Sequence, residues 1–429
     1  MKRRIFRRPR GVTGWSVLLV VLGAIVYGGL YICTWYVQNQ VHRALTEHDQ
    51  QAVDAWLARA RWFPMRSART EFLEARVARH KRDPDGMSEH LQRAGELGYD
   101  AESLAREQWL AQAELGDMNL LSNQMAMMLT DPRGDELAIV EAYVKGLVRV
   151  ERYQAAVEML EAWCKDYPGD IYPRQLLGSV LVDMSRWEEA GTLFDQILRE
   201  NPENERAAYG LGVVLMTQQK IDLAVPYLEL AARDKNLYAD AMIRKARCYR
   251  ALAEPERARA VLKEMVEASQ DRTAIVELAQ LNLDEGQFEL AMGRVEPLVE
   301  QDSKKVDARY IYAQVLRQLG RQEEAAEHFS VVMEINRNLA LANELAERLG
   351  EGTESVDRRV QIAQLQFQYG SEQEGLRWLV DAIRVDDTHR EALEALYEYY
   401  ARKAEQYPDD RDTRRRRDDF QQRLQQLTP

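Results

Sequence analysis

The sequence predicts an all-α protein of about ten repeated helix pairs that follow one N-terminal hydrophobic helix. Three observations predict this fold. Gly and Pro together supply only 35 of the 429 residues, about 8%, which is low for a sandwich or barrel with many turns. Ala, Leu, Glu, Arg and Gln, which all favour helices, dominate the composition. A hydrophobic motif also recurs at a nearly constant spacing along most of the chain.

The formal net charge of −12 is divided unevenly along the chain. The first ten residues hold six cations and no acid, whereas residues 38–429 hold 52 cations and 70 acids, a net charge of −18. Such an acidic body is unsuited to binding a phosphate backbone, so we expect no nucleic-acid partner. The three cysteines, Cys33, Cys164 and Cys248, exclude a disulfide-rich scaffold, and we expect the last two to be buried small hydrophobes.

An almost unbroken apolar run occupies residues 14–37. As a helix, this run rises about 36 Å, which is enough to cross a hydrocarbon core of about 30 Å. Trp15 lies at one end and Trp35 and Tyr36 at the other, where aromatic rings favour the headgroup level. The pattern predicts a transmembrane signal anchor, so the lipid bilayer is an expected partner of residues 14–37.

The charges around this run predict its orientation. All six cations lie in residues 1–13, while the neutral residues 38–40 follow the run. The positive-inside rule therefore predicts a basic cytoplasmic tail, a single membrane pass and a body in the periplasm of a bacterium, at its cytoplasmic membrane. A cleaved signal peptide and a lipoprotein remain alternatives. The run exceeds the usual 7–15 residues of a signal peptide, and Ile32 replaces the small residue expected before a lipidated Cys33.

A motif with a period of about 34 residues extends over residues 38–336 and recurs once more after a longer step. The segment 186–194 (RWEEAGTLF) reappears in altered form at 220–224, 254–258 and 321–325. Internal repeats of this length indicate a stacked array of small structural units. One small or apolar residue marks each copy: Ala52, Met87, Leu121, Ala156, Ala190, Ala224, Ala258, Ala291, Ala325 and Gly375.

These repeats resemble the tetratricopeptide repeat (TPR) family, whose unit is a helix–turn–helix of 34 residues. The resemblance covers roughly residues 45–410 and is strongest at 137–335. It implies an α-solenoid in which the first helix of each repeat lines a groove for peptides or partner proteins. The copy at 171–204 matches the family pattern best, with Leu177, Gly178, Leu181, Trp187, Ala190, Phe194, Ile197 and Pro202.

The physical pattern of this copy agrees with the resemblance. Gly178 and Ala190 are small where two antiparallel helices must approach closely, and Trp187 and Phe194 are large where the gap to the next pair must be filled. Pro202 ends the second helix. A single helix pair has apolar surface that it cannot bury alone, so stacking against neighbouring pairs is expected to stabilise it.

The register is interrupted once. The step from Ala325 to Gly375 is 16 residues longer than one repeat, and the segment 337–355 supplies the excess. Its leucines predict an inserted helix, which Gly350 and Gly352 would end in a loop. Residues 356–429 are then expected to form terminal repeats and a polar, charge-alternating C-terminal helix that caps the array.

No motif for catalysis, metal or cofactor binding stands out. The six histidines form no HExxH motif, and we expect His80 and His90 to be solvated. Gly210 and Gly212 match helix-packing positions of the repeat rather than a dinucleotide-binding loop. We therefore expect no enzyme activity, no cofactor, no metal and no small-molecule substrate.

The resemblance implies a candidate binding groove on the first helices of the repeats. Arg244, Arg247 and Arg250 follow one another at i, i+3 and i+6, so they share one helix face. This cationic stripe has two interpretations, a solvated helix face or a patch that binds acidic peptide segments. The candidate groove residues are Arg206, Tyr209, Arg244, Arg247, Arg250, Gln280, Tyr310, Gln314 and Arg317.

The sequence thus predicts a non-catalytic, membrane-anchored scaffold that binds protein or peptide partners in envelope assembly. One alternative is an accessory factor of a polysaccharide synthesis, export or secretion machine. A second alternative is a regulator of an enzyme at the membrane. The identity of the captured partners distinguishes these three functions.

The predicted topology has a direct test. Alkaline phosphatase, which is active only in the periplasm, is fused after Pro429, and we expect an active fusion because the cations precede residues 14–37. A matched fusion at residue 13 should be inactive. Protease added to intact spheroplasts should degrade residues 45–429, and protection of these residues would contradict the topology.

Overall fold

Helices joined by short turns make up the described part of the chain. The computed structural model describes residues 28–30, 32–45, 50–60, 67–81, 83–114, 116, 122–150, 152–302, 304, 306–349, 353–408 and 410–427. The predicted membrane segment therefore falls mostly outside the described residues, with its end at 32–37 inside a helix that runs to residue 45. None of the helices in these ranges combines the length and the apolar character needed to cross a bilayer.

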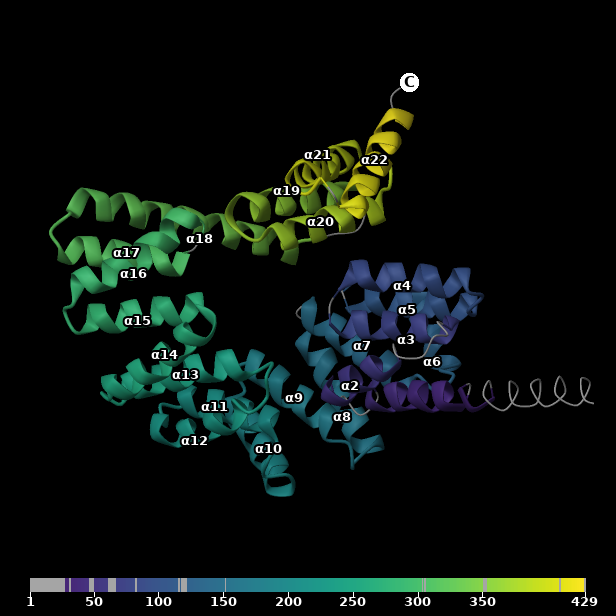
Figure 1. Cartoon of the computed structure of the whole chain (residues 1–429), viewed down its shortest axis with the longest axis horizontal. Coiled ribbons are helices and arrows are strands. Elements are labelled where there is room, and N and C mark those ends of the chain that lie inside the picture. The colour runs from purple at the N-terminus through teal and green to yellow at the C-terminus, as the bar shows by residue number, and fades with distance from the viewer. Residues whose placement is uncertain are drawn as a thin grey trace, which may run out of the picture. The chain divides into compact units, whose positions relative to one another are not determined.

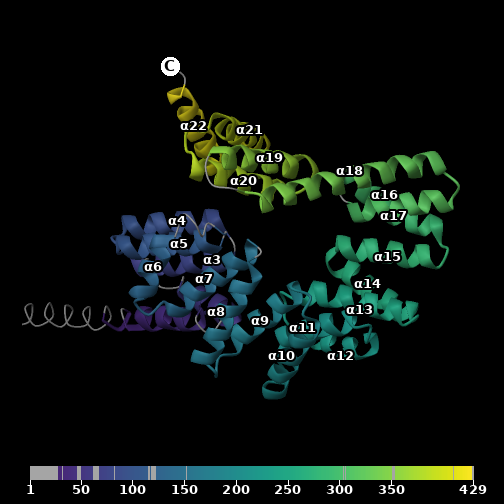
Figure 2. The same ribbon diagram turned by 180° about the vertical axis from the view of Figure 1, so that it is seen from behind.

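Consecutive helices pair side by side, as Figures 1 and 2 show from opposite sides. The first helices of the pairs are α3 (Ala68–His80), α5 (Ala101–Glu114), α7 (Glu136–Arg149), α9 (Ile171–Asp183), α11 (Glu205–Thr217), α13 (Tyr238–Ala251), α15 (Arg272–Asp284), α17 (Val306–Gln318), α19 (Thr353–Tyr369) and α21 (Arg390–Gln406). This arrangement agrees with the predicted helix–turn–helix repeat.

The second helices alternate with the first ones along the chain. They are α2 (Gln50–Ala60), α4 (Pro84–Glu96), α6 (Ser122–Thr130), α8 (Tyr153–Asp166), α10 (Trp187–Glu200), α12 (Ile221–Ala231), α14 (Pro255–Ser269), α16 (Phe288–Gln301), α18 (Gln322–Glu347), α20 (Glu372–Val385) and α22 (Arg411–Gln426). Helix α10 ends two residues before Pro202, as predicted. The chain divides into two compact units, residues 1–197 and 198–429, and each is described by itself.

The turns inside the strongest repeats confirm the period of about 34 residues. Five successive turns each contain one residue with positive φ, and these residues recur every 33 or 34 positions. The amide of the following residue donates to a carbonyl five residues back, for example Arg186 N to Leu181 O at 2.8 Å and Arg321 N to Leu316 O at 2.9 Å. This is the Schellman pattern, which satisfies the last carbonyls of a helix. The left-handed residues are Ser185, Gln219, Ala253, Gly286 and Gly320.

Side chains at the N-termini of several first helices satisfy free amides. Asn204 accepts a hydrogen bond from Ala207 N at 2.8 Å, and Asp271 accepts one from Ala274 N at 2.8 Å. Amides in the first turn have no partner within the helix, so a capping Asn or Asp supplies one. These caps fix where α11 and α15 begin and hence which of their residues face the neighbouring helices.

The close helix crossing predicted for the best repeat is present. Ala190 is fully buried and Phe194 is 2% exposed. A Cβ atom built on Gly178 would lie 2.6 Å from the Phe194 ring, closer than any real Cβ contact. Gly178 is therefore required because the aromatic ring occupies the space of a side chain. Trp187 is half-buried at the start of α10.

The core is divided among adjacent helix pairs. Buried side chains of α13 and α14 pack with Ala274, Leu278 and Leu281 of α15, which belongs to the next pair. Cys248 of α13 is fully buried, as predicted, whereas Cys164 of α8 is only half-buried. The array thus buries apolar surface both within a pair and between pairs.

The predicted inserted helix needs correction. Residues 337–347 are helical, but they continue α18 without a break instead of forming a separate element. Helix α18 is 26 residues long and ends at Glu347, shortly before the Gly350 predicted to stop it. The sequence 337–347 contains neither Gly nor Pro, so nothing in it interrupts the helix.

The C-terminal helix α22 packs on α21. Phe420 stacks on Tyr400 with ring centroids 5.7 Å apart, and Arg416 donates to the Tyr400 hydroxyl at 2.9 Å. Both rings belong to the last hydrophobic cluster, which spans α19 to α22. A mostly polar helix therefore contributes one aromatic side chain to the core and leaves most of its other residues for solvent.

The close approach at Gly178 predicts an unequal response to added methyl groups. Gly178→Ala should lower the free energy of unfolding by about 1–3 kcal/mol, because the new methyl clashes with Phe194. The matched control is Gly293→Ala in α16, where nothing lies within 4 Å and the change should raise helix stability by about 0.5–1 kcal/mol. Urea titration followed by circular dichroism measures both, and equal effects would contradict the packing.

Candidate functional site

The nine predicted groove residues all lie on first helices of the C-terminal unit. All of them are exposed or half-buried, which leaves their side chains accessible to a partner. We call them the candidate binding face. They are distributed as Arg206 and Tyr209 on α11, Arg244, Arg247 and Arg250 on α13, Gln280 on α15, and Tyr310, Gln314 and Arg317 on α17.

Two arginines of the predicted cationic stripe share one carboxylate. Arg247 Nε donates to Glu277 Oε1 at 2.7 Å, and Arg250 Nη1 donates to Glu277 Oε2 at 3.1 Å. Glu277 belongs to α15, and its side chain is only 12% exposed. Arg250 also lies 3.7 Å from Asp284, which accepts a hydrogen bond from Gln280 at 2.6 Å. The stripe thus joins α13 to α15 as well as facing solvent.

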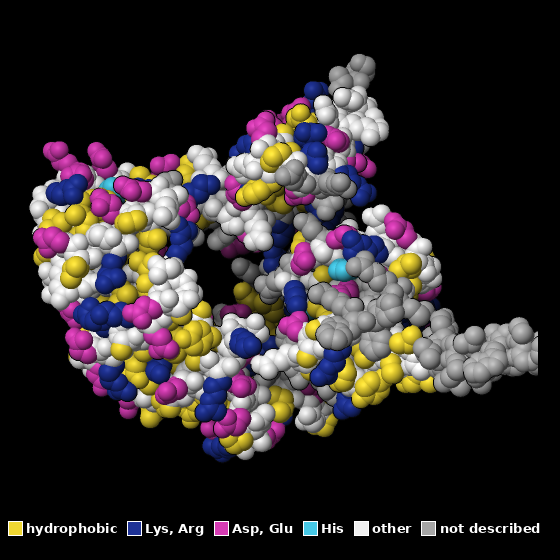
Figure 3. Space-filling view, in the orientation of Figure 1, with side chains coloured by type: hydrophobic (Ala, Val, Ile, Leu, Met, Phe, Trp, Pro, Cys, Tyr) yellow, Lys and Arg dark blue, Asp and Glu magenta, His cyan; other side chains and the backbone are white. Residues whose placement is uncertain are grey.

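The third arginine of the stripe belongs to a small cluster between α11 and α13. Arg244 Nε donates to the Tyr209 hydroxyl at 2.8 Å and lies 3.1 Å from Asp240 Oδ2. The Tyr209 hydroxyl in turn donates to Asp240, and the Arg244 guanidinium lies over the Tyr209 ring, 5.4 Å from its centroid. All three arginines of the stripe therefore have acidic neighbours, and acidic and basic side chains are interspersed on the surface seen in Figure 3.

Helix α17 presents an aromatic surface. Tyr310 is 44% exposed, and its ring meets the edge of Phe329 with centroids 5.7 Å apart. Arg317 lies over the other ring of this pair, 5.7 Å from the Phe329 centroid. Tyrosine and arginine are enriched at the centres of protein interfaces, because they offer large contact area with few rotatable bonds or a forked set of donors.

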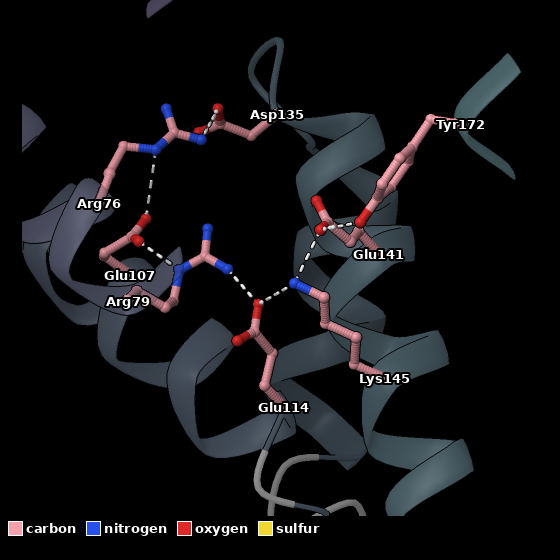
Figure 4. Close-up of polar contacts among 8 residues, drawn as sticks. All are labelled: Arg76, Arg79, Glu107, Glu114, Asp135, Glu141, Lys145 and Tyr172. Atoms are coloured by element: carbon pink, nitrogen blue, oxygen red, sulfur yellow. Dashed lines mark hydrogen bonds and ion pairs between the residues drawn. The ribbon is translucent and has the colours of Figure 1, made fainter. Parts of the chain in front are cut away.

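The N-terminal unit contains a chain of alternating charges that the sequence did not predict. Figure 4 shows Asp135, Arg76, Glu107, Arg79, Glu114, Lys145, Glu141 and Tyr172 following one another. These residues come from the first helices α3, α5, α7 and α9 and from the residue before α7. The chain therefore links four consecutive repeats through polar contacts on their first helices.

The contacts of the first half of this chain are short. Arg76 Nη2 donates to Asp135 Oδ1 at 2.9 Å, and Arg76 Nε lies 3.5 Å from Glu107 Oε2. Arg79 Nε donates to Glu107 Oε1 at 2.5 Å, and Arg79 Nη1 donates to Glu114. The side chains of Arg79 and Glu107 are 1% and 2% exposed, so this pair is fully desolvated. Each charge must therefore be compensated by its neighbours.

The second half of the chain continues the alternation. Lys145 Nζ lies 2.7 Å from Glu141 Oε1 and 3.5 Å from Glu114 Oε1. The Tyr172 hydroxyl donates to Glu141 Oε1 at 2.6 Å. Because Glu141 is 2% exposed, the lysine and the tyrosine compensate a carboxylate that has almost no contact with water.

Burial and neighbouring charge act in opposite directions on these groups. Burial alone raises the pKa of Glu107, but the guanidiniums of Arg79 and Arg76 outweigh it, and the net pKa is lowered. For Arg79, burial lowers the pKa, and Glu107 and Glu114 raise it by more. Both residues are therefore charged at neutral pH, and the folded state favours their charged forms.

The prediction that His80 and His90 are solvated is wrong. Burial, assisted by Arg79, lowers the pKa of His80 to about 3, so its ring is neutral at physiological pH. His90 Nδ1 lies 2.8 Å from Glu71, whose side chain is 6% exposed. Both rings are half-buried, His80 near charged residues of α5 and α7 and His90 against Glu71 of α3, which no local sequence signal indicates.

A spacing of 31 residues could have indicated these contacts. It separates Arg76 from Glu107, Glu114 from Lys145, and Glu141 from Tyr172, and the same spacing separates Tyr209 from Asp240 in the C-terminal unit. This spacing equals one repeat of about 34 residues minus about one helical turn. It places a residue on one first helix opposite a residue on the preceding first helix. Pairs of complementary polar residues at this spacing therefore signal contact between repeats.

The buried pair predicts a large and pH-dependent mutational effect. Glu107→Gln should lower the free energy of unfolding by about 3–5 kcal/mol at pH 7, because it removes the buried carboxylate that the guanidiniums of Arg76 and Arg79 share. A folded-state pKa below the ordinary 4.5 stabilises the protein above that value, and this stabilisation is lost as the pH falls through the lowered pKa. The difference between wild type and variant should therefore shrink in acid, as measured by urea titration at several pH values.

An exposed pair supplies the control for this experiment. Glu89 pairs with Arg93 on α4, and both side chains are exposed. Glu89→Gln should change the free energy of unfolding by less than about 1 kcal/mol. Similar losses for Glu89→Gln and Glu107→Gln would contradict the special importance of the buried chain.

Family comparisons match the middle of the chain. Two family models, each described as a tetratricopeptide repeat, match residues 176–237 and 215–281. A third, described as alkyl sulfatase dimerisation, matches residues 250–340. This stretch begins at the end of α13 and stops within α18, so it consists of the same alternating helix pairs. No curated protein sequence matches the chain.

Solved structures with similar helical arrays include two tetratricopeptide repeat proteins and a pilus biogenesis factor. A tetratricopeptide repeat protein from Parabacteroides merdae is 13% identical, with 58% of this chain and 92% of that chain covered and a TM-score of 0.40. A thermophilic TPR protein from Thermus thermophilus is 24% identical, with coverages of 40% and 93% and a TM-score of 0.33. PilW, a type IV pilus biogenesis factor, is 19% identical, with coverages of 44% and 89% and a TM-score of 0.40.

These TM-scores are too low to support an argument about function. The assignment of tetratricopeptide repeats rests instead on the helix pairs, the recurring left-handed turn residue and the two matching repeat models. Together these show tetratricopeptide repeats within residues 176–281, and the same alternation of helices continues on either side of them.

Proposed function

We propose that this protein is a non-catalytic scaffold that binds partner proteins or peptides on the candidate binding face. The supporting observation is that each first helix buries some side chains in the core and leaves others accessible. In α17, Ile311, Val315 and Leu316 are buried, while Tyr310 and Arg317 remain accessible on the same helix. Successive repeats place such accessible side chains on α11, α13, α15 and α17, and a partner segment that contacts several repeats would gain from all of them.

The contacts of the cationic stripe indicate which interactions with a partner contribute most to affinity. Glu277 and Asp240 compensate the arginines of α13, so the face is not a free cationic patch. Exposed ion pairs contribute little net energy and are screened by salt. We therefore expect partner affinity to depend on aromatic contact with Tyr310 more than on the net charge of the partner.

We further propose that residues 14–37 anchor the protein in a bacterial cytoplasmic membrane, with the repeats on the periplasmic side. The support is the length of the apolar run and the six cations before it. A scaffold held at this surface would collect its partners close to the membrane, which favours a function in envelope assembly. The partners recovered from the native membrane decide between this process and polysaccharide or protein export.

Photo-crosslinking tests the proposed face in the full chain. Benzoylphenylalanine replaces Arg206 or Arg317 on first helices and, as controls, the exposed Glu256 or Glu323 on second helices. We expect partner adducts in native membranes only from the first pair, identified by mass spectrometry. Adducts that form equally from the second-helix positions would contradict the proposed face.

A recovered partner then allows single contacts to be measured. Tyr310→Ala should weaken binding by about tenfold, because it removes a large aromatic contact surface. Arg247→Gln should weaken it by less than about threefold, since Glu277 already compensates that charge. Surface plasmon resonance measures both, and a larger loss for Arg247→Gln than for Tyr310→Ala would restore the acidic-peptide interpretation.

A further inference from the structure

The N-terminal unit contains a cavity with an excess of guanidinium groups. Its volume is about 290 Å³, and it lies among α3, α5, α6, α7 and the helix at 32–45. Four arginines line it, Arg69, Arg76, Arg106 and Arg133, against the two carboxylates of Glu107 and Asp135. This excess is notable because the chain beyond residue 37 is acidic overall.

The two carboxylates of the cavity are already engaged. Arg76 contacts both, at 2.9 Å from Asp135 and 3.5 Å from Glu107, and Glu107 also accepts from Arg79 outside the lining. Their negative charge is therefore compensated within the buried chain of charges. They do not neutralise the remaining arginines of the cavity.

Two arginines of the cavity bond to neutral acceptors. Arg69 donates to Asn39 Oδ1 at 2.8 Å, and Arg106 donates to Pro132 O at 3.2 Å. Neither makes an ion pair with another described residue. Arg106 is only 8% exposed, and a guanidinium has five donors, so a single carbonyl leaves most of its capacity unused. A buried charge of this kind favours an anionic ligand.

The third and fourth arginines complete the rim. Arg133 pairs with Glu102 at 3.0 Å and Asp131 at 3.0 Å, so its charge is compensated at the surface. Arg76 Nε is buried without a hydrogen-bond partner. Forked, planar donors of this kind match the oxygens of a phosphate group, to which they can donate in pairs.

The helix at 32–45 fixes the distance from the cavity to the expected membrane surface. Gln38 Nε2 donates to Ser67 Oγ at 2.7 Å and to Thr70 Oγ1 at 2.9 Å, and His42 lines the cavity. Tyr36, expected at the headgroup level, precedes His42 by six residues, a rise of about 9 Å. The polar headgroup layer is about 5–8 Å deep on each side of the bilayer. On a helix along the bilayer normal, the cavity would therefore lie at the outer edge of the headgroup layer, within reach of lipid headgroups.

We propose that this cavity binds the phosphate of an anionic phospholipid headgroup, with Arg69 and Arg106 as its main donors. The proposal rests on the membrane anchoring proposed above. The headgroup would lie against the same helix that enters the bilayer and would hold the first repeats at a fixed height. The Tyr99 hydroxyl in the lining suits the hydroxyl groups of a glycerol headgroup, and the Ser103 hydroxyl, which donates to Asp100 Oδ2 at 2.7 Å, can accept from them.

Calorimetry on the full chain in a neutral detergent tests this site. The probes are dihexanoylphosphatidylglycerol, dihexanoylphosphatidylcholine, sodium phosphate and a Glu-rich octapeptide. We expect phosphatidylglycerol to bind at least about tenfold more tightly than the other three, because only it combines a net charge with the headgroup. Arg69→Gln and Arg106→Gln should each weaken this binding by about tenfold, and Arg93→Gln, which removes one exposed charge from α4, should leave it unchanged.

The other possible outcomes would contradict specific parts of the proposal. Equal binding of the two lipids, or an equal loss in Arg93→Gln, would overturn the cavity as the site. Tighter binding of phosphate or of the acidic peptide would overturn the lipid as the ligand. The half-buried Arg69 carries the test if thermal unfolding shows that Arg106→Gln is not folded. Lipid binding in detergent does not require a membrane pass, so a failed phosphatase fusion with intact binding would remove the anchoring alone.

Discussion

Among the described residues, no helix pair has a complete core of its own, and the rest of the structure depends on that constraint. The cluster around Leu278 of α15 draws on α13 and α14, and Ala279 on the same helix joins the cluster of α16 and α17. Helix α15 therefore contributes side chains both to the core of the preceding pair and to the core of its own pair. Burial of apolar surface between pairs is what makes stacking favourable.

This use of the first helices leaves one of their faces outside the apolar core, and the two units use that face differently. In the N-terminal unit it carries a buried chain of charges from Asp135 to Tyr172, in which Arg79 and Glu107 are almost fully desolvated. In the C-terminal unit the corresponding contacts, such as Arg247 with Glu277, remain partly exposed. Buried charges hold one geometry, because every partner is required, whereas exposed pairs tolerate rearrangement and leave the face available to other proteins.

The buried chain of charges also favours an anion-binding cavity in the N-terminal unit. A dense set of guanidiniums is stable there because Glu107 and Asp135 compensate part of it. Arg69 and Arg106 are left with neutral acceptors beside the helix that leads from residues 14–37. If both proposals hold, the protein has two separate surfaces, one for the membrane and one for partner proteins, on the same repeated framework.

The sequence by itself determined the repeat, the order of its helices and the positions of closest approach. The period marked Gly178 as a position of close helix approach, because a repeated local pattern of small residues encodes packing within one pair. It did not place Phe194 there: that ring was expected in the gap to the next pair, and the structure places it against Gly178 of its own pair. It also indicated helical residues at 337–347, but not that they extend α18. Only the tertiary structure decided the partners of the charges. Arg79, His80 and Glu277 look like solvated surface residues in the sequence, since burial and ion pairing between repeats depend on how neighbouring helices stack, and stacking brings together residues some 30 positions apart.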